Sequence, residues 1–220
     1  MPDPDEAHHY RRKYRGLISI DSKPSEVDSR LLSVLYTPGV AQLCEYIAED
    51  PRRSFTHSGR GNTVAVVSDG SSALGLGDVG PEATVPILES KAVFFKKMAG
   101  LDALPLSLRS GGIDDIVDTV KRIAPTVGAV SLEDISSPIC FEVEQVLSDQ
   151  LDIPVLHNDQ HGTAITALSI LHNVCRLQGH RNLETLSVVI VGAGAAGLAT
   201  VKLFHHAGIN DITLCDRQGV

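Results

Sequence analysis

Residues 155–164, VLHNDQHGTA, place His157, Asp159 and His161 at alternate positions. In an extended segment, alternate side chains lie on one face, so these three could converge. Two imidazoles and a carboxylate are typical ligands of a transition metal, which favours a His–Asp–His site. The alternative is that only one of the three is a ligand.

Two adjacent acidic residues, Glu133 and Asp134, follow an apolar stretch that predicts a strand over residues 127–132. The next predicted strand, residues 153–156, leads to Asp159. Sites in open α/β folds gather at the carboxyl ends of strands. Three carboxylates there would suit Mg²⁺ or Mn²⁺, which prefer oxygen ligands. The pair alone would more readily be an acidic turn before a helix, and Asp159 is what favours the metal interpretation.

One lysine lies within an apolar helical stripe of residues 86–100. Lys91 falls on the face formed by Ile87, Leu88, Phe94, Phe95 and Met98, whereas Lys96 and Lys97 fall on the opposite face. A lysine that faces an apolar interior loses solvation and can act as a base. The alternative is that Lys91 extends its ammonium to the rim. Tyr36, before a Pro-Gly turn, is either a packing residue or a catalytic acid assisted by a nearby cation.

The stretch VVIVGAGAAGLA runs from an apolar strand into a GxGxxG turn and then a helix. The first glycine permits a tight turn, the second lets the backbone approach a pyrophosphate, and the third packs helix on strand. A second strand ends at Asp216, where a carboxylate could bind the ribose hydroxyls. Arg217 follows and could accommodate a 2′-phosphate, so NAD is favoured only modestly over NADP. A turn needed only for packing is the alternative. The predicted cofactor-binding residues are Gly192, Ala193, Gly194, Ala195, Ala196, Gly197 and Asp216.

These motifs need an α/β fold to position them. Helices and strands alternate along the second half of the chain, which predicts parallel strand pairing. The predicted strands are residues 63–67, 127–132, 153–156, 186–191 and 211–215. The predicted helices are residues 28–34, 42–49, 86–100, 113–124, 137–151, 163–177 and 195–207.

Composition narrows the classes of function. The net charge of −8 and the sequence pI near 5.5 argue against nucleic-acid binding, which needs a basic surface. No apolar run approaches the roughly 18 residues that a membrane span needs. The four cysteines are far apart and form no CxxC motif, which favours reduced thiols and a cytoplasmic protein. The polar first residues lack the apolar core of a signal peptide.

Taken together, six ordered motifs resemble those of malic enzymes of the short bacterial type. They are YTPGVA, LGLGDVGP, ESKAVFFKK, SLEDI, HNDQHGTA and VGAGAAG, and the resemblance extends over the chain from about Glu6. The family oxidatively decarboxylates L-malate to pyruvate and CO₂ with Mg²⁺ or Mn²⁺ and NAD or NADP, and it suggests a homodimer.

The resemblance implies a role for each candidate residue. Tyr36 would be the general acid that protonates the enolpyruvate carbon, and Lys91 would be the base at the malate hydroxyl. Glu133, Asp134 and Asp159 would hold the metal, which leaves the two histidines as supporting or packing residues.

Two residues depart from the family pattern. Asn158 stands where relatives usually carry an aspartate linked to the lysine–tyrosine proton network, so rate or pH optimum could differ. Ser90 stands where relatives usually carry glycine, which is a minor change.

The resemblance also predicts two units. Residues 1–160 would form the substrate and metal domain, and residues 161–220 the start of a Rossmann-like NAD(P)-binding domain that is incomplete. We therefore expect weak activity from these 220 residues alone. The rivals are an inactive, truncated paralogue that binds or dimerises, and a malic-enzyme-like module fused to a phosphate-acetyltransferase-like region.

Overall fold

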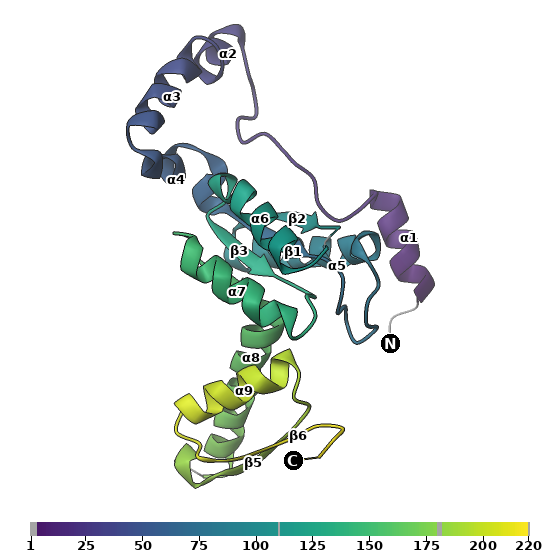
Figure 1. Cartoon of the computed structure of the whole chain (residues 1–220). Coiled ribbons are helices and arrows are strands. Elements are labelled where there is room, and N and C mark those ends of the chain that lie inside the picture. The colour runs from purple at the N-terminus through teal and green to yellow at the C-terminus, as the bar shows by residue number, and fades with distance from the viewer. Residues whose placement is uncertain (1–3, 110, 180–181, 220) are drawn as a thin grey trace.

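The computed structural model describes residues 4–109, 111–179 and 182–219. Its larger sheet has four parallel strands in the order β2-β1-β3-β4, and a second sheet pairs β5 with β6 in parallel (Figure 1). The strands are β1 Thr63–Ser68, β2 Asp102–Ser107, β3 Ala129–Leu132, β4 Val155–His157, β5 Ser187–Val191 and β6 Asp211–Cys215. The α/β class with parallel pairing, predicted from the alternating pattern, is confirmed.

Three helices cover the larger sheet. Helix α5, Pro81–Phe94, starts with a proline after Gly80, packs on β1 and β2, and continues into a π-helical turn, Phe95–Ala99. Helices α6, Ile113–Ile123, and α7, Ile139–Gln150, contact each other and bury apolar faces. The main core lies here and includes Val67, Ile116, Val120, Leu132, Val143 and Leu147.

The longest helix in the described part of the chain joins the two sheets. Helix α8, Asn158–Leu177, begins directly after β4 and extends toward the second sheet, where it packs against α9, Ala195–His206 (Figure 1). Helix α9 connects β5 to β6 and so completes the strand–helix–strand unit that the glycine motif predicted.

Residues 4–62 form mainly helices. Helix α1, Pro4–Tyr14, lies beside α5, because Arg11 Nη1 is 2.8 Å from Glu89 Oε2. Helices α2, Ser29–Leu35, and α3, Gly39–Glu49, project away from the sheet (Figure 1). The remaining short elements are α4 Ser54–His57 and the 3₁₀ turns Pro51–Arg53, Gly59–Asn62, Ala124–Thr126 and Leu183–Thr185.

The structure corrects three local expectations. Residues 158–162 are helical rather than extended, so α8 begins five residues before the predicted start. Strand β2 was not predicted, because it contains Pro105, which lacks an N–H; an edge strand tolerates this. Leu88 of the expected apolar stripe is buried but Phe94 and Met98 are exposed, so the stripe is buried only in part. No helix in the described ranges is long and apolar enough to span a membrane.

Candidate functional site

The predicted acidic residues meet where β3 and β4 end. Leu132 pairs with His157 in the parallel register, so the residues that follow them are neighbours. The backbone N–H of Asp134 donates to Asp159 Oδ2 over 2.8 Å, and Asp134 itself has a positive φ of 54°. Aspartate tolerates this left-handed conformation better than most residues. The sheet register therefore brings together the three carboxylates expected from the sequence.

Lys91 reaches this cluster from helix α5. Its Nζ lies 3.1 Å from Glu133 Oε2, with the lysine side chain 29% exposed and the glutamate side chain 3% exposed. Ser131 Oγ donates to the other glutamate oxygen over 3.1 Å. The partly buried position agrees with the predicted inward-facing lysine. The buried face of α5 is formed by Thr84, Leu88 and Ala92, of which only Leu88 belongs to the predicted apolar stripe.

The clustered negative charge shifts the proton affinity of two carboxyl groups. Burial raises the pKa of Glu133, and Lys91 opposes that increase. Burial, followed by the charges of Asp159 and Glu133, raises the pKa of Asp134 to about 6. Three carboxylates around one ammonium leave an excess of negative charge in a low-dielectric site, which a divalent cation would offset.

The donors fit a hard cation in kind. All three are carboxylates, and Asp134 Oδ2 is buried without a hydrogen-bond partner. Among the described residues, however, no group of three or more His, Cys, Asp or Glu side chains is arranged as a ready metal site. The carboxylates instead contact groups of the protein, and their side chains would have to turn to converge on an ion.

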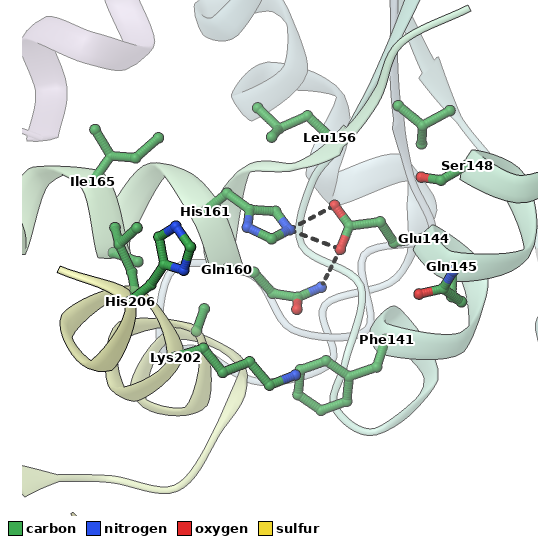
Figure 2. Close-up of a pocket in the computed structure, with 14 residues that line it drawn as sticks. Phe141, Glu144, Gln145, Ser148, Leu156, Gln160, His161, Ile165, Lys202 and His206 are labelled. Atoms are coloured by element: carbon green, nitrogen blue, oxygen red, sulfur yellow. Dashed lines mark hydrogen bonds and ion pairs between the residues drawn. The ribbon is translucent and has the colours of Figure 1, made fainter. Parts of the chain in front are cut away.

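The two histidines do not form the His–Asp–His arrangement that an extended segment would give. His157 ends β4, is fully buried, and its Nε2 lies 3.9 Å from Asp159 Oδ2. Burial lowers the pKa of His157, which favours the neutral ring. His161 lies one helical turn farther on and contacts Glu144 instead (Figure 2). Because residues 158–161 are helical, alternate positions point in different directions.

Asn158, the departure from the family pattern, is part of the cluster. Its Nδ2 donates to Glu133 Oε2 over 3.2 Å, on the same oxygen that Lys91 contacts. Gly162 makes room for this side chain, since a Cβ at that position would lie 2.2 Å from Asn158 Oδ1.

The glycine turn also has the predicted geometry. Gly192 has a φ of 116°, and a Cβ on Gly197 would lie 1.7 Å from the carbonyl oxygen of Gly192. A cavity of about 590 Å³ opens beside the turn and is lined by residues 191–194 and 216–218, so Asp216 lies next to the glycines. A Cβ on Gly194 would meet nothing within 4 Å, which leaves space for a ligand against the backbone.

Among the predicted catalytic and metal-binding residues, Tyr36 is the one that the described structure does not bring to the carboxylate cluster. It is the C-cap of helix α2 and is 68% exposed, and α2 belongs to the part of the molecule that projects from the sheet (Figure 1). Two polar residues that contact the site went unnoticed in the sequence, Ser131 and Glu144. Ser131 opens the SLEDI motif but was assigned no role there, and its contact with Glu133 is local. Glu144 lies outside the six motifs, and only the packing of α7 against the start of α8 reveals its contacts.

Comparisons with known proteins relate the whole chain to one enzyme family. The family profile described as malic enzyme, N-terminal domain, matches residues 20–112. The chain is 46% identical over 215 residues to the bifunctional malic/malolactic enzyme of Bacillus subtilis, covering 98% of this chain and 52% of that protein. It is 48% identical over 204 residues to the NAD-dependent malic enzyme of Geobacillus stearothermophilus, covering 93% of this chain and 42% of that protein.

A solved structure extends the likeness to three dimensions. The crystal structure of the NAD-dependent malic enzyme of Thermotoga maritima superposes with a TM-score of 0.92 at 40% identity, covering all of this chain and 57% of that one. Other relatives are named NADP-dependent malic enzymes. The chain spans about half the length of the relatives described above. By its motifs, its sequence and its fold, the chain belongs to the malic enzyme family.

Proposed function

We propose that this chain forms the malate- and metal-binding part of an NAD(P)-dependent malic enzyme, which converts L-malate to pyruvate and CO₂. The observation that carries the proposal is the 3.1 Å contact between Lys91 and Glu133 beside Asp134 and Asp159. One helix and two strand ends thus supply a proton-transfer group and oxygen ligands in the same place. The names of the relatives point to the same activity.

Glu133, Asp134 and Asp159 would hold Mg²⁺ or Mn²⁺. When bound, the ion would act as a Lewis acid on the hydroxyl and carboxylate oxygens of malate. The elevated pKa of Asp134, about 6, supports this assignment, because carboxylates that repel one another gain most from a shared cation.

Lys91 would take the proton from the malate hydroxyl. Its amine is held at the edge of the cluster by Glu133, and Asn158 donates to the same glutamate oxygen. Asn158 therefore competes with Lys91 for Glu133 and adds no negative charge. A lysine held by one shared partner can exchange that partner for substrate.

The glycine turn and Asp216 would bind the dinucleotide. Gly194, the N-cap of α9, lines the cavity beside the turn, where the N-terminus of this helix would stabilise a pyrophosphate. Asp216 would accept from the ribose hydroxyls, which favours NAD, although Arg217 also lines the cavity and could pair with the 2′-phosphate of NADP.

Tyr36 would supply the proton to the enolpyruvate carbon, and we propose a homodimer to complete its surroundings. Four large side chains are exposed on helix α2 and at its C-cap, in the projecting helical segment: Leu32, Val34, Leu35 and Tyr36. A second copy is the occupant that we propose for this apolar surface. Leu32→Glu and Leu35→Glu should give a monomer by analytical ultracentrifugation, and a dimer that persists in both variants would contradict this surface.

A binding experiment tests the substrate assignment. Thermal unfolding is followed with L-malate alone, Mn²⁺ alone and both together. We expect malate to raise the Tm of the unmodified chain only when Mn²⁺ is present. In Asp159→Asn, malate should not raise Tm, with or without Mn²⁺. The exposed Asp152→Asn is the control and should behave as the unmodified chain. Malate binding that is independent of Mn²⁺ would contradict the proposal.

A parallel assay for NADH or NADPH at 340 nm separates turnover from binding. Metal-dependent malate binding without turnover would support the rival role of a non-catalytic binding protein.

A further inference from the structure

We propose that Glu144 is a positioning residue that fixes the turn carrying Asn158 and Asp159, and thereby sets the metal affinity of the site. The inference rests on the proposed metal site. Glu144 belongs to helix α7, away from every motif singled out in the sequence, and its side chain is 14% exposed.

One carboxylate here accepts from three donors. Glu144 Oε1 accepts from the backbone N–H of His157 over 2.6 Å, and Oε2 accepts from Gln160 Nε2 over 3.0 Å. His161 Nε2 lies 2.9 Å from the carboxylate, completing the set (Figure 2). Each donor comes from the junction between β4 and α8.

The position of these donors along the chain gives the contact its significance. His157 precedes Asn158 and Asp159, while Gln160 and His161 follow them. The two residues between contact the opposite side of the site, Asn158 through Glu133 and Asp159 through the N–H of Asp134. Glu144 thus holds both ends of a five-residue segment whose middle carries a proposed metal ligand.

The start of α8 is held in place by a residue of another helix, not by a capping side chain of its own. His157 occupies the N-cap position of α8 but makes no side-chain capping hydrogen bond. The first N–H groups of a helix lack intrahelical acceptors and favour a nearby negative charge. Glu144 supplies that charge from α7, so the start of α8 is fixed by tertiary contact.

Charge and shape both matter at this position. A glutamine would keep the length but replace one acceptor oxygen with an NH₂ group, which would face a donor. An aspartate would keep the charge but shorten the side chain by one methylene, so that it could not reach all three donors. Partners that orient metal ligands typically change metal affinity by 10- to 100-fold when they are lost.

The experiment measures Mn²⁺ binding from the electron paramagnetic resonance signal of the free ion. We expect Glu144→Gln to raise the Kd for Mn²⁺ by roughly 10- to 100-fold. Glu142→Gln is the matched control, the same change on an exposed residue of the same helix, and should leave Kd unchanged. A Kd for Glu144→Gln within twofold of the unmodified chain would overturn the inference. If Glu144→Gln does not fold, Glu144→Asp is held to the same criterion.

A second readout needs no metal and separates this inference from the proposed function. Hydrogen exchange in the metal-free chain should accelerate in a peptide spanning residues 155–163 of Glu144→Gln, and remain unchanged in residues 113–123. If the unmodified chain binds no Mn²⁺, the proposed metal site fails, and exchange alone decides the role of Glu144. Unchanged exchange at residues 155–163 would then overturn that role.

Discussion

Replacing Asp134 by asparagine should stabilise the metal-free chain and abolish metal binding. Burial and two neighbouring carboxylates raise the pKa of Asp134 from 3.8 to about 6. Each pKa unit corresponds to about 1.4 kcal/mol, so ionised Asp134 costs the folded state up to about 3 kcal/mol. Asparagine has nearly the same shape, carries no charge and tolerates the positive φ at this position. We therefore expect a gain of roughly 1–3 kcal/mol in the free energy of unfolding at pH 7.5.

The gain should depend on pH in a defined direction. Because the pKa of Asp134 is higher in the folded than in the unfolded state, the folded state binds this proton more tightly. The resulting stability is fully present below the unfolded value near 3.9 and is lost as pH rises through about 6. The advantage of Asp134→Asn should therefore be smaller at pH 5 than at pH 7.5.

Urea unfolding followed by far-ultraviolet circular dichroism measures this effect in the presence of EDTA. Asp152→Asn, an exposed change, is the control and should alter stability by less than about 0.5 kcal/mol. Adding Mn²⁺ at 100 times its Kd should stabilise the unmodified chain by about 2.7 kcal/mol and leave Asp134→Asn unaffected. The reasoning is refuted if Asp134→Asn is less stable than the unmodified chain at pH 7.5, or if Mn²⁺ stabilises both equally.

Two further predictions concern the other parts of the site. Asn158→Asp places a carboxylate where an amide now donates to Glu133 over 3.2 Å. The free energy of unfolding of the metal-free chain should therefore fall by roughly 1–3 kcal/mol, and Mn²⁺ should restore it. Equal urea midpoints without metal would contradict this prediction. Gly194→Ala meets open space and should fold normally yet bind NAD more weakly, whereas Gly197→Ala, whose Cβ would lie 1.7 Å from a carbonyl oxygen, should lower Tm. Calorimetric titration with NAD tests Gly194→Ala, and thermal unfolding tests Gly197→Ala. Undiminished NAD binding by Gly194→Ala would argue against the dinucleotide site.

Much of the fold was predictable because the strands of the second half are short apolar runs between clear helices. Parallel pairing then places Glu133 and Asp134 beside Asp159 without further information. The glycine turn was predictable for a similar reason, since its spacing fixes a backbone geometry. Strand β2 was missed because Pro105 is typical of loops, and only its edge position makes it acceptable.

The supporting contacts of the site could not be predicted, because they depend on tertiary structure. Glu144 looks like an ordinary polar residue of an amphipathic helix until α7 is packed beside the start of α8. The alternation of His157, Asp159 and His161 indicated an extended face, but helix α8 begins at Asn158 and directs His161 to Glu144. The stripe around Lys91 was similarly misleading, since Phe94 and Met98 are exposed while Thr84, Leu88 and Ala92 form the buried face of α5.

The central claim is that a metal held by the three carboxylates, with Lys91 at the substrate oxygen and Tyr36 at the substrate carbon, forms a site for proton transfer on malate and pyruvate. The most direct measurement is the exchange of pyruvate methyl protons with D₂O, followed by proton nuclear magnetic resonance with Mn²⁺ present and no dinucleotide. We expect the chain to accelerate this exchange, and expect the acceleration to vanish with EDTA, in Asp159→Asn and in Tyr36→Phe, which removes the group assigned to the carbon. Exchange that proceeds equally well without Mn²⁺ or without the Tyr36 hydroxyl would contradict the account.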